Sequence, residues 1–195
     1  MVDLIGQHAA IENELQDAMQ RVMQTGAFVK GPEVQAFSEE LQAHTGSRFV
    51  IPCGNGTDAL QIALMALGIG PGDEVITTGF TFISTIEVVA LLGATPVLVD
   101  VHSDTFNIQA EQVAAAITSR TKAIVPVHLF GQMADMDALL ALSEKTGIPL
   151  IEDNAQAISA RWHGAEGERK DAPQSGTLGL MGTTSFFPSK NLGCM

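Results

Sequence analysis

The chain has 195 residues, of which 46% are hydrophobic and 16% are charged, a composition typical of a globular domain with a substantial core. A formal net charge of -12 without a cluster of basic residues argues against a nucleic-acid partner. Cys53, Cys194 and the five histidines form no disulfide framework or metal motif, and neither a signal peptide nor a membrane span is visible, so we expect a cytoplasmic protein without bound metal.

Two helices are predicted first. Apolar residues at helical spacing predict a helix over 8–24 that Gly26 ends, and Pro32 begins a second helix that Gly46 ends. Short apolar runs then alternate with helical stretches. The runs predict strands over 48–52, 74–77, 96–100, 122–127, 148–152 and 183–187, and the stretches predict helices over 57–67, 84–92, 109–117 and 135–146.

The predicted strands are apolar throughout and show no alternation, which is typical of strands that are covered on both faces. The order of elements therefore predicts an α/β fold, with a mostly parallel sheet and helices on both faces. The polar, glycine-rich residues 163–179 predict a loop or an exposed hairpin. We expect one domain, with N-terminal helices over 1–46 and an α/β region over 47–195.

Residues 53–60 join a predicted strand to a predicted helix. Glycines such as Gly56 let the backbone approach a ligand closely, and the N–H groups at a helix start suit a phosphate, to which Thr57 adds a hydroxyl. The alternative is an ordinary turn capped by Asn55 or Thr57, and for this segment taken alone it is the commoner case. The second glycine-rich segment, 68–73, follows a helix, so it predicts a turn and not a dinucleotide site.

Aromatic residues follow the predicted strand 74–77. Phe80 and Phe82 can form a flat stacking surface for a ring, although such residues more often belong to a core.

An acidic pair, Glu152 and Asp153, lies where another predicted strand ends, and ligands of open α/β sheets bind at the carboxyl ends of strands. One of these carboxylates can pair with a protonated ring nitrogen, or each can be a helix cap or a solvated loop carboxylate. His128 also ends a predicted strand, but a single histidine is more often structural, and we assign it no role.

The last predicted strand contains Ser185, breaks at Pro188 and is followed by Lys190. A lysine at the edge of a sheet can condense with an aldehyde when its ammonium loses a proton, and a serine hydroxyl can contact phosphate. The alternatives are a solvated surface lysine and a small strand residue.

Together these segments resemble the DegT/DnrJ/EryC1/StrS family of sugar aminotransferases, which are pyridoxal-phosphate enzymes of the aspartate-aminotransferase fold type I. The similarity covers essentially the whole chain. Its motifs, in order, are KGPEV (30–34), GNGTDAL (54–60), GPGDEV (70–75), PVHLFGQ (126–132), EDNAQ (152–156) and SFFPSK (185–190).

The resemblance implies a role for each matching residue. Lys190 is the catalytic lysine that bonds to the aldehyde of pyridoxal 5'-phosphate, Asp153 is the partner of its ring nitrogen, and Gln156 lies beside its ring hydroxyl. The residues that match the phosphate site and the ring-stacking position are Gly56, Thr57, Ser185 and Phe82.

The resemblance also implies transamination of a nucleotide-linked keto-sugar, UDP-linked and 3-keto or 4-keto, with an amino-acid donor such as glutamate, for surface polysaccharide or amino-sugar biosynthesis. It implies a homodimer without nucleic-acid or membrane partners. Related dehydratases carry histidine at the lysine position, so Lys190 argues against that branch. Because the family's chains are roughly twice as long, we expect an incomplete large domain without its C-terminal domain, inactive by itself.

Two other classes of function remain as alternatives. A non-catalytic binding or interaction protein on the same scaffold is disfavoured, because Asp153, Gln156, Ser185 and Lys190 each have a distinct chemical task. A dinucleotide-binding dehydrogenase is disfavoured because no G-x-G-x-x-G follows the first predicted strand.

Overall fold

The computed structural model describes residues 3–164, 167 and 171–194. By their internal contacts the residues form two compact units, Met1–Pro52 and Cys53–Met195. Among the described residues, no helix combines the length and the apolar character that crossing a bilayer requires.

The first unit consists of the helices α1 (Leu4–Ala9), α2 (Glu12–Thr25) and α3 (Pro32–Thr45). The single helix predicted over 8–24 is wrong at its start, because Ile11 has non-helical backbone angles (φ -126°, ψ 16°) and separates α1 from α2. Gly26 ends α2 in the left-handed conformation, as the sequence predicted, because a residue without Cβ adopts it at little cost.

The strand predicted over 48–52 is wrong. This segment is irregular, and the side chains of Phe49 and Ile51 are 72% and 80% exposed. An apolar run becomes a strand only where another strand pairs with it, and the described part of the chain supplies none here.

The second unit contains a parallel sheet. Its strands are β1 (Glu74–Thr78), β2 (Thr95–Val99), β3 (Thr121–Val125), β4 (Ile151–Asp153) and β5 (Met181–Thr183). The pairs β2–β1, β1–β3 and β4–β5 are all parallel, and the parallel bridges Ile124–Leu150 and Val127–Asp153 join β3 to β4. The strand order is therefore β2-β1-β3-β4-β5.

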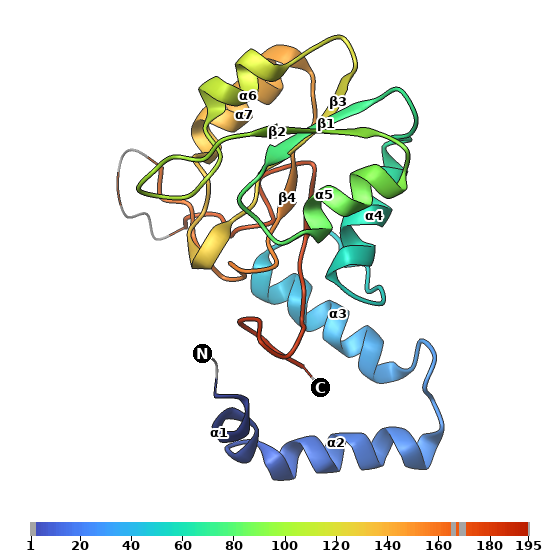
Figure 1. Ribbon diagram of the computed structural model, residues 1–195. Coiled ribbons are helices and arrows are strands. Elements are labelled where there is room, and N and C mark those ends of the chain that lie inside the picture. Colours follow the sequence, from blue (N-terminus) through green and yellow to red (C-terminus); the bar gives the residue numbers. More distant parts are fainter. Residues whose placement is uncertain (1–2, 165–166, 168–170, 195) are drawn as a thin grey trace. The chain divides into compact units, whose positions relative to one another are not determined.

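Helices cover both faces of this sheet. The helices are α4 (Gly56–Ala66), α5 (Ser84–Leu91), α6 (Ala110–Ala116) and α7 (Met136–Thr146), and a short 3-10 turn covers Leu129–Gly131. Val75 of β1 packs in a core cluster with α4 and α5, whereas its neighbour Ile76 packs in a second cluster with α6 and α7. Figure 1 shows the two helix pairs on opposite sides of β1 and β2. The predicted α/β fold is confirmed, and β1 and β4 lack alternation because both of their faces are buried.

The strands that lead to the predicted site residues are shorter than expected. The strand predicted over 183–187 occupies Met181–Thr183 instead, so Ser185 follows the strand and does not belong to it. The aromatic residues after β5 lie in irregular chain that turns where the Lys190 N–H donates to the Phe187 carbonyl (2.8 Å).

The residues just before the segment predicted to be a loop or hairpin over 163–179 pair with residues inside it. Arg161 and Gln174 form an antiparallel bridge, and the Trp162 N–H donates to the Pro173 carbonyl (2.9 Å). Of this segment, residues 165–166 and 168–170 lie outside the described residues.

The buried carboxylate of Glu152 joins β4 to two neighbouring segments. Its Oε2 lies 2.7 Å from Nε2 of His128 and accepts the N–H of Gly176 (2.8 Å), while Oε1 accepts the N–H groups of Leu178 (2.7 Å) and Gly179 (2.6 Å). Glu152 and His128 are both fully buried. This one side chain therefore fixes the chain after β3 and the chain before β5 against β4.

The protonation of the His128 ring follows from its second hydrogen bond. The N–H of Ala134 donates to Nδ1 (3.2 Å), so Nδ1 carries no proton and Nε2–H donates to Glu152. Burial raises the pKa of Glu152, but the hydrogen bonds from His128, Gly179 and Gly176 outweigh burial and lower the pKa overall. The ionised form of Glu152 is the one that the fold requires.

Replacing Ile124 by alanine tests the sheet core. Ile124 is fully buried between β1, β4 and the helices of the second cluster, so Ile124→Ala should lower the free energy of unfolding by about 2–5 kcal/mol in urea titrations. The control Ile62→Ala removes a side chain that is 48% exposed on α4 and should change the free energy by no more than about 0.5 kcal/mol. Equal losses in the two variants would contradict this assignment of the core.

Replacing Glu152 by glutamine tests the buried carboxylate. Glu152→Gln places an NH2 group against N–H donors and should lower the free energy of unfolding at pH 7 by about 3–5 kcal/mol. Because the folded-state pKa lies below the ordinary value of 4.5, the contribution of ionised Glu152 is complete above that pH and is lost as the pH falls through the folded-state pKa. The stability difference between wild type and Glu152→Gln should therefore shrink on acidification, and a difference that grows below pH 4.5 would refute the assignment.

Candidate functional site

The predicted site residues lie at one edge of the parallel sheet. Asp153 is the last residue of β4, Gln156 follows it, Ser185 follows β5, and Phe82 lies between β1 and α5. The carboxyl ends of parallel strands meet at the same edge, which is where ligands bind in open α/β sheets.

The start of α4 lies against the chain that follows β5. A Cβ on Gly56 would come within 2.7 Å of the Ser185 Cβ and 3.1 Å of its Oγ, so only glycine permits this approach. The Asn55 side chain caps the helix by accepting the N–H of Asp58 (2.9 Å). The cap uses Asn55, and Gly56 and Thr57 begin the helix where Ser185 approaches Gly56, at a position where backbone N–H groups suit an anion.

Asp153 is a buried carboxylate with a donor on each oxygen. Its Oδ2 accepts the hydroxyl of Thr85 (2.7 Å) and its Oδ1 accepts the N–H of Ala155 (3.2 Å). Burial raises the pKa of Asp153 above its ordinary value, and the Thr85 and Ala155 hydrogen bonds, together with the charge of Lys190, oppose this shift without cancelling it.

Lys190 is held in a turn. Its N–H donates to the Phe187 carbonyl (2.8 Å), and the Cys194 N–H donates to the Phe186 carbonyl (2.8 Å). The Lys190 residue is partly buried.

Gln156 is oriented by the backbone of Phe130. The Phe130 N–H donates to Oε1 of Gln156 (3.2 Å). A backbone N–H can only donate, so the amide oxygen faces Phe130 and the NH2 group of Gln156 is left to donate elsewhere. Phe130 makes this contact from a left-handed backbone conformation (φ 56°, ψ 30°), which is uncommon for a residue other than glycine.

The structure gives the two neighbouring carboxylates, Glu152 and Asp153, different surroundings. Glu152 points into the protein and receives its four donors there, whereas Asp153 extends toward Thr85 on α5 and lies within electrostatic reach of Lys190. The neighbouring strand residues face opposite sides, as successive residues of a strand do. His128, to which the sequence assigned no role, holds Glu152 in place.

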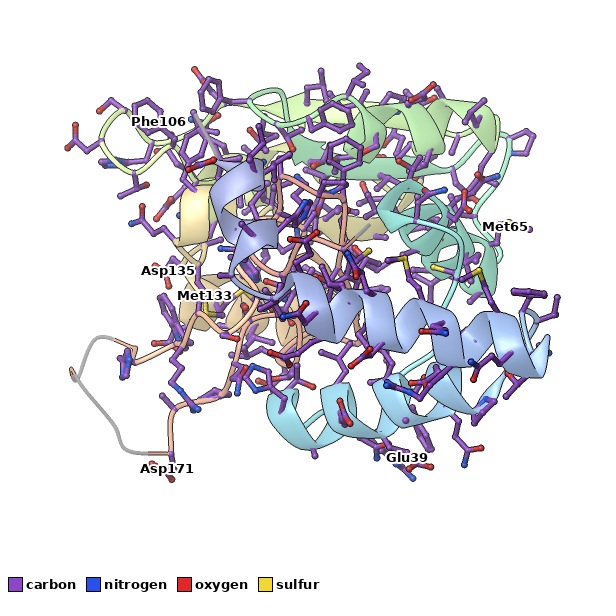
Figure 2. All side chains as sticks on the ribbon, turned by 90° about the horizontal axis from the view of Figure 1, so that it is seen from below. Glu39, Met65, Phe106, Met133, Asp135 and Asp171 are labelled. Carbon is purple, nitrogen blue, oxygen red and sulfur yellow. The ribbon has the colours of Figure 1, made fainter. Side chains whose placement is uncertain are left out.

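The sequence also missed an aromatic cluster at this edge. The ring of Phe80 lies 5.4 Å from that of Phe106 and 6.4 Å from that of Phe130, measured between centroids. These residues come from the loops after β1, β2 and β3, and Figure 2 shows Phe106 on the loop after β2. An aromatic residue shortly after each of three adjacent strands was a signal for this cluster. Phe82 lies in the loop of Phe80 and is 63% exposed.

Comparison with known proteins extends over the same residues. A sequence profile of the DegT/DnrJ/EryC1/StrS aminotransferase family matches residues 9–195. The chain is 50% identical over 193 residues to a UDP-2-acetamido-2-deoxy-3-oxo-D-glucuronate aminotransferase of Pseudomonas aeruginosa, covering 99% of this chain and 52% of that protein. The chain thus spans about half the length of the curated relatives it matches.

Solved structures agree with this similarity. A DegT/DnrJ/EryC1/StrS aminotransferase from Brucella abortus superposes with a TM-score of 0.91 at 45% identity, covering all of this chain and 52% of that one. The pyridoxal-phosphate form of the sugar aminotransferase Spr1654 from Streptococcus pneumoniae superposes with a TM-score of 0.85 at 29% identity, covering 93% of this chain and 48% of that one. Sequence, fold and the order of the site segments agree, and the chain belongs to the DegT/DnrJ/EryC1/StrS aminotransferase family.

Proposed function

We propose that this chain is the cofactor-binding large-domain portion of a pyridoxal-phosphate-dependent aminotransferase that acts on a nucleotide-linked keto-sugar. The observation that carries the proposal is the buried carboxylate of Asp153 at the carboxyl edge of a parallel sheet, held by Thr85 and Ala155 and subject to the charge of Lys190. An amine that can react with an aldehyde and a carboxylate that can hold a cationic ring are the two groups that this cofactor requires.

The remaining residues fit pyridoxal phosphate in their chemistry. The start of α4 and the Ser185 hydroxyl, brought together by the missing side chain of Gly56, suit its phosphate. The NH2 group of Gln156, left free to donate by the contact with Phe130, suits the oxygen on its ring. The buried carboxylate of Asp153 suits its ring nitrogen, because a proton shared there offsets the cost of a buried charge.

Each residue then has a defined task. When bound, pyridoxal phosphate supplies an aldehyde and an electron-withdrawing ring. Asp153 holds a proton on the ring nitrogen, and Gln156 and Ser185 orient the ring and its phosphate. Phe82 offers an exposed aromatic face for stacking on the ring. Lys190 acts as the nucleophile and, once displaced by the amino donor, as the group that moves a proton at the reacting carbon.

The relatives support the proposed substrate class. A protein of 50% identity is an aminotransferase for a UDP-linked 3-oxo sugar acid, so we infer a UDP-linked keto-sugar with its carbonyl at carbon 3, in preference to carbon 4. The amino donor that we propose is an amino acid such as glutamate, and the proposed assembly is a homodimer.

Borohydride reduction tests the role of Lys190. The full-length gene product, incubated with pyridoxal phosphate and reduced, should carry a pyridoxyl group on the Lys190 peptide in mass spectrometry, because reduction fixes a lysine–aldehyde bond. Lys190→Arg should abolish the adduct, whereas Lys145→Arg, which changes an exposed lysine on α7, should leave it unchanged. An adduct spread over several lysines, or retained in Lys190→Arg, would exclude the proposed role.

An amino-transfer assay tests the substrate. With glutamate as donor, the full-length product should aminate UDP-linked 3-keto sugars faster than 4-keto sugars, and Asp153→Asn should reduce the rate by at least about a hundredfold, because the proton on the ring nitrogen is no longer held. A protein that forms the Lys190 adduct but aminates none of these keto-sugars would instead be a binding protein on this scaffold.

A further inference from the structure

We propose that Thr81 and Thr85 form a directed chain of hydroxyl groups that orients the Asp153 carboxylate for a cationic ring and supports its ionised form against burial. Thr85 is thus a positioning residue that acts on the cofactor through Asp153. This inference deepens the proposed function and rests on it.

The chain of contacts runs from a loop, through a helix, to a strand. Oγ1 of Thr81 lies 3.2 Å from Oγ1 of Thr85, and Oγ1 of Thr85 lies 2.7 Å from Oδ2 of Asp153. Thr85 lies in the first turn of α5 and is 1% exposed, Thr81 precedes that helix and is partly buried, and Asp153 is 4% exposed. Water has little access to the middle of this chain, so the hydroxyl groups replace it as donors.

The direction of the two hydrogen bonds follows from counting protons. When Asp153 faces a cationic ring it is ionised and can only accept, so Thr85 then donates its single hydroxyl proton to Asp153. Thr85 then has no proton left for Thr81, and Thr81 must be the donor in the contact between the two hydroxyl groups. Both O–H dipoles therefore point toward the carboxylate, and each bond strengthens the other.

The geometry also fixes how Asp153 faces a ligand. Oδ1 is held by the Ala155 N–H and Oδ2 by Thr85, so the carboxyl plane has one anchor on each side. A carboxylate oxygen has room for a further donor, and a protonated ring nitrogen is a donor of that kind. Without Thr85, Asp153 would keep a single direct donor in a buried position, where the neutral acid is favoured and holds a ring proton poorly.

Comparing the binding of two ligands distinguishes the positioning role of Thr85 from a general structural role. The first is pyridoxal phosphate, and the second is its 1-deaza analogue, in which a CH group replaces the ring nitrogen. Thr85→Val keeps the shape of the side chain and removes its hydroxyl, so it should weaken binding of pyridoxal phosphate about tenfold. Binding of the analogue, which offers Asp153 no ring N–H, should change by no more than about twofold. Dissociation constants are measured by absorbance titration of the full-length gene product.

Three variants complete the experiment. Thr85→Ser keeps the hydroxyl and should bind both ligands as the wild type does. Thr81→Val removes only the hydrogen bond between Thr81 and Thr85. It should weaken the binding of pyridoxal phosphate by about threefold and leave the binding of the analogue unchanged. Should Thr85→Val not fold, as judged by circular dichroism and thermal unfolding, the same comparison is made with Thr81→Val, whose side chain lies outside the helix.

The outcomes are distinct. A selective loss of affinity for pyridoxal phosphate supports the proposed chain of hydroxyl groups. Equal weakening of the binding of both ligands in Thr85→Val, or no weakening of either, overturns the chain while the proposed function stands. A wild-type protein that binds neither ligand overturns the proposed function itself.

Discussion

The site depends on one buried carboxylate, that of Glu152. A charge in a protein interior is strongly unfavourable unless donors surround it, and Glu152 receives four, from the His128 ring and from the backbone at 176, 178 and 179. These donors belong to chain segments on either side of β4. The folded chain can satisfy the carboxylate only when those segments are in place, so the cost of burying one charge enforces the arrangement of three segments.

That arrangement places the residues with chemical roles. The segment that Glu152 anchors on one side continues through β5 to Ser185 and Lys190, and the segment on the other side leads to Phe130, whose N–H orients Gln156. Asp153, next to Glu152 on the same strand, faces the opposite side and meets Thr85 on α5. Through the alternation of side chains along a strand, one carboxylate supports the fold and its neighbour is the one that we propose for the ligand.

Some departures from regular structure lie at this edge of the sheet. Phe106 and Phe130 adopt left-handed backbone conformations, and Gly56 allows a helix start to approach a neighbouring chain closer than any side chain would permit. Such features cost free energy and persist where surrounding contacts enforce them. The rest of the sheet follows ordinary rules, with apolar strands between two layers of helices, which explains why the fold class was predictable and the details of the site were not.

The sequence by itself determined the α/β class, the order of the elements after residue 56, and the segments that meet at the carboxyl edge. Apolar strand runs and the residues that begin and end helices are local patterns, so they can be recognised in the sequence alone. The strand predictions were wrong at 48–52 and 183–187, where strand formation depends on pairing with another strand. An apolar run carries no information on whether a partner strand exists. The resemblance singled out Asp153, but only the tertiary structure showed why Glu152 and Asp153 differ, gave His128 a structural role and revealed Thr85. Those assignments depend on which donors reach a buried oxygen, and apart from the Ala155 N–H the donors to the two carboxylates come from residues that lie 24 to 68 positions away along the chain.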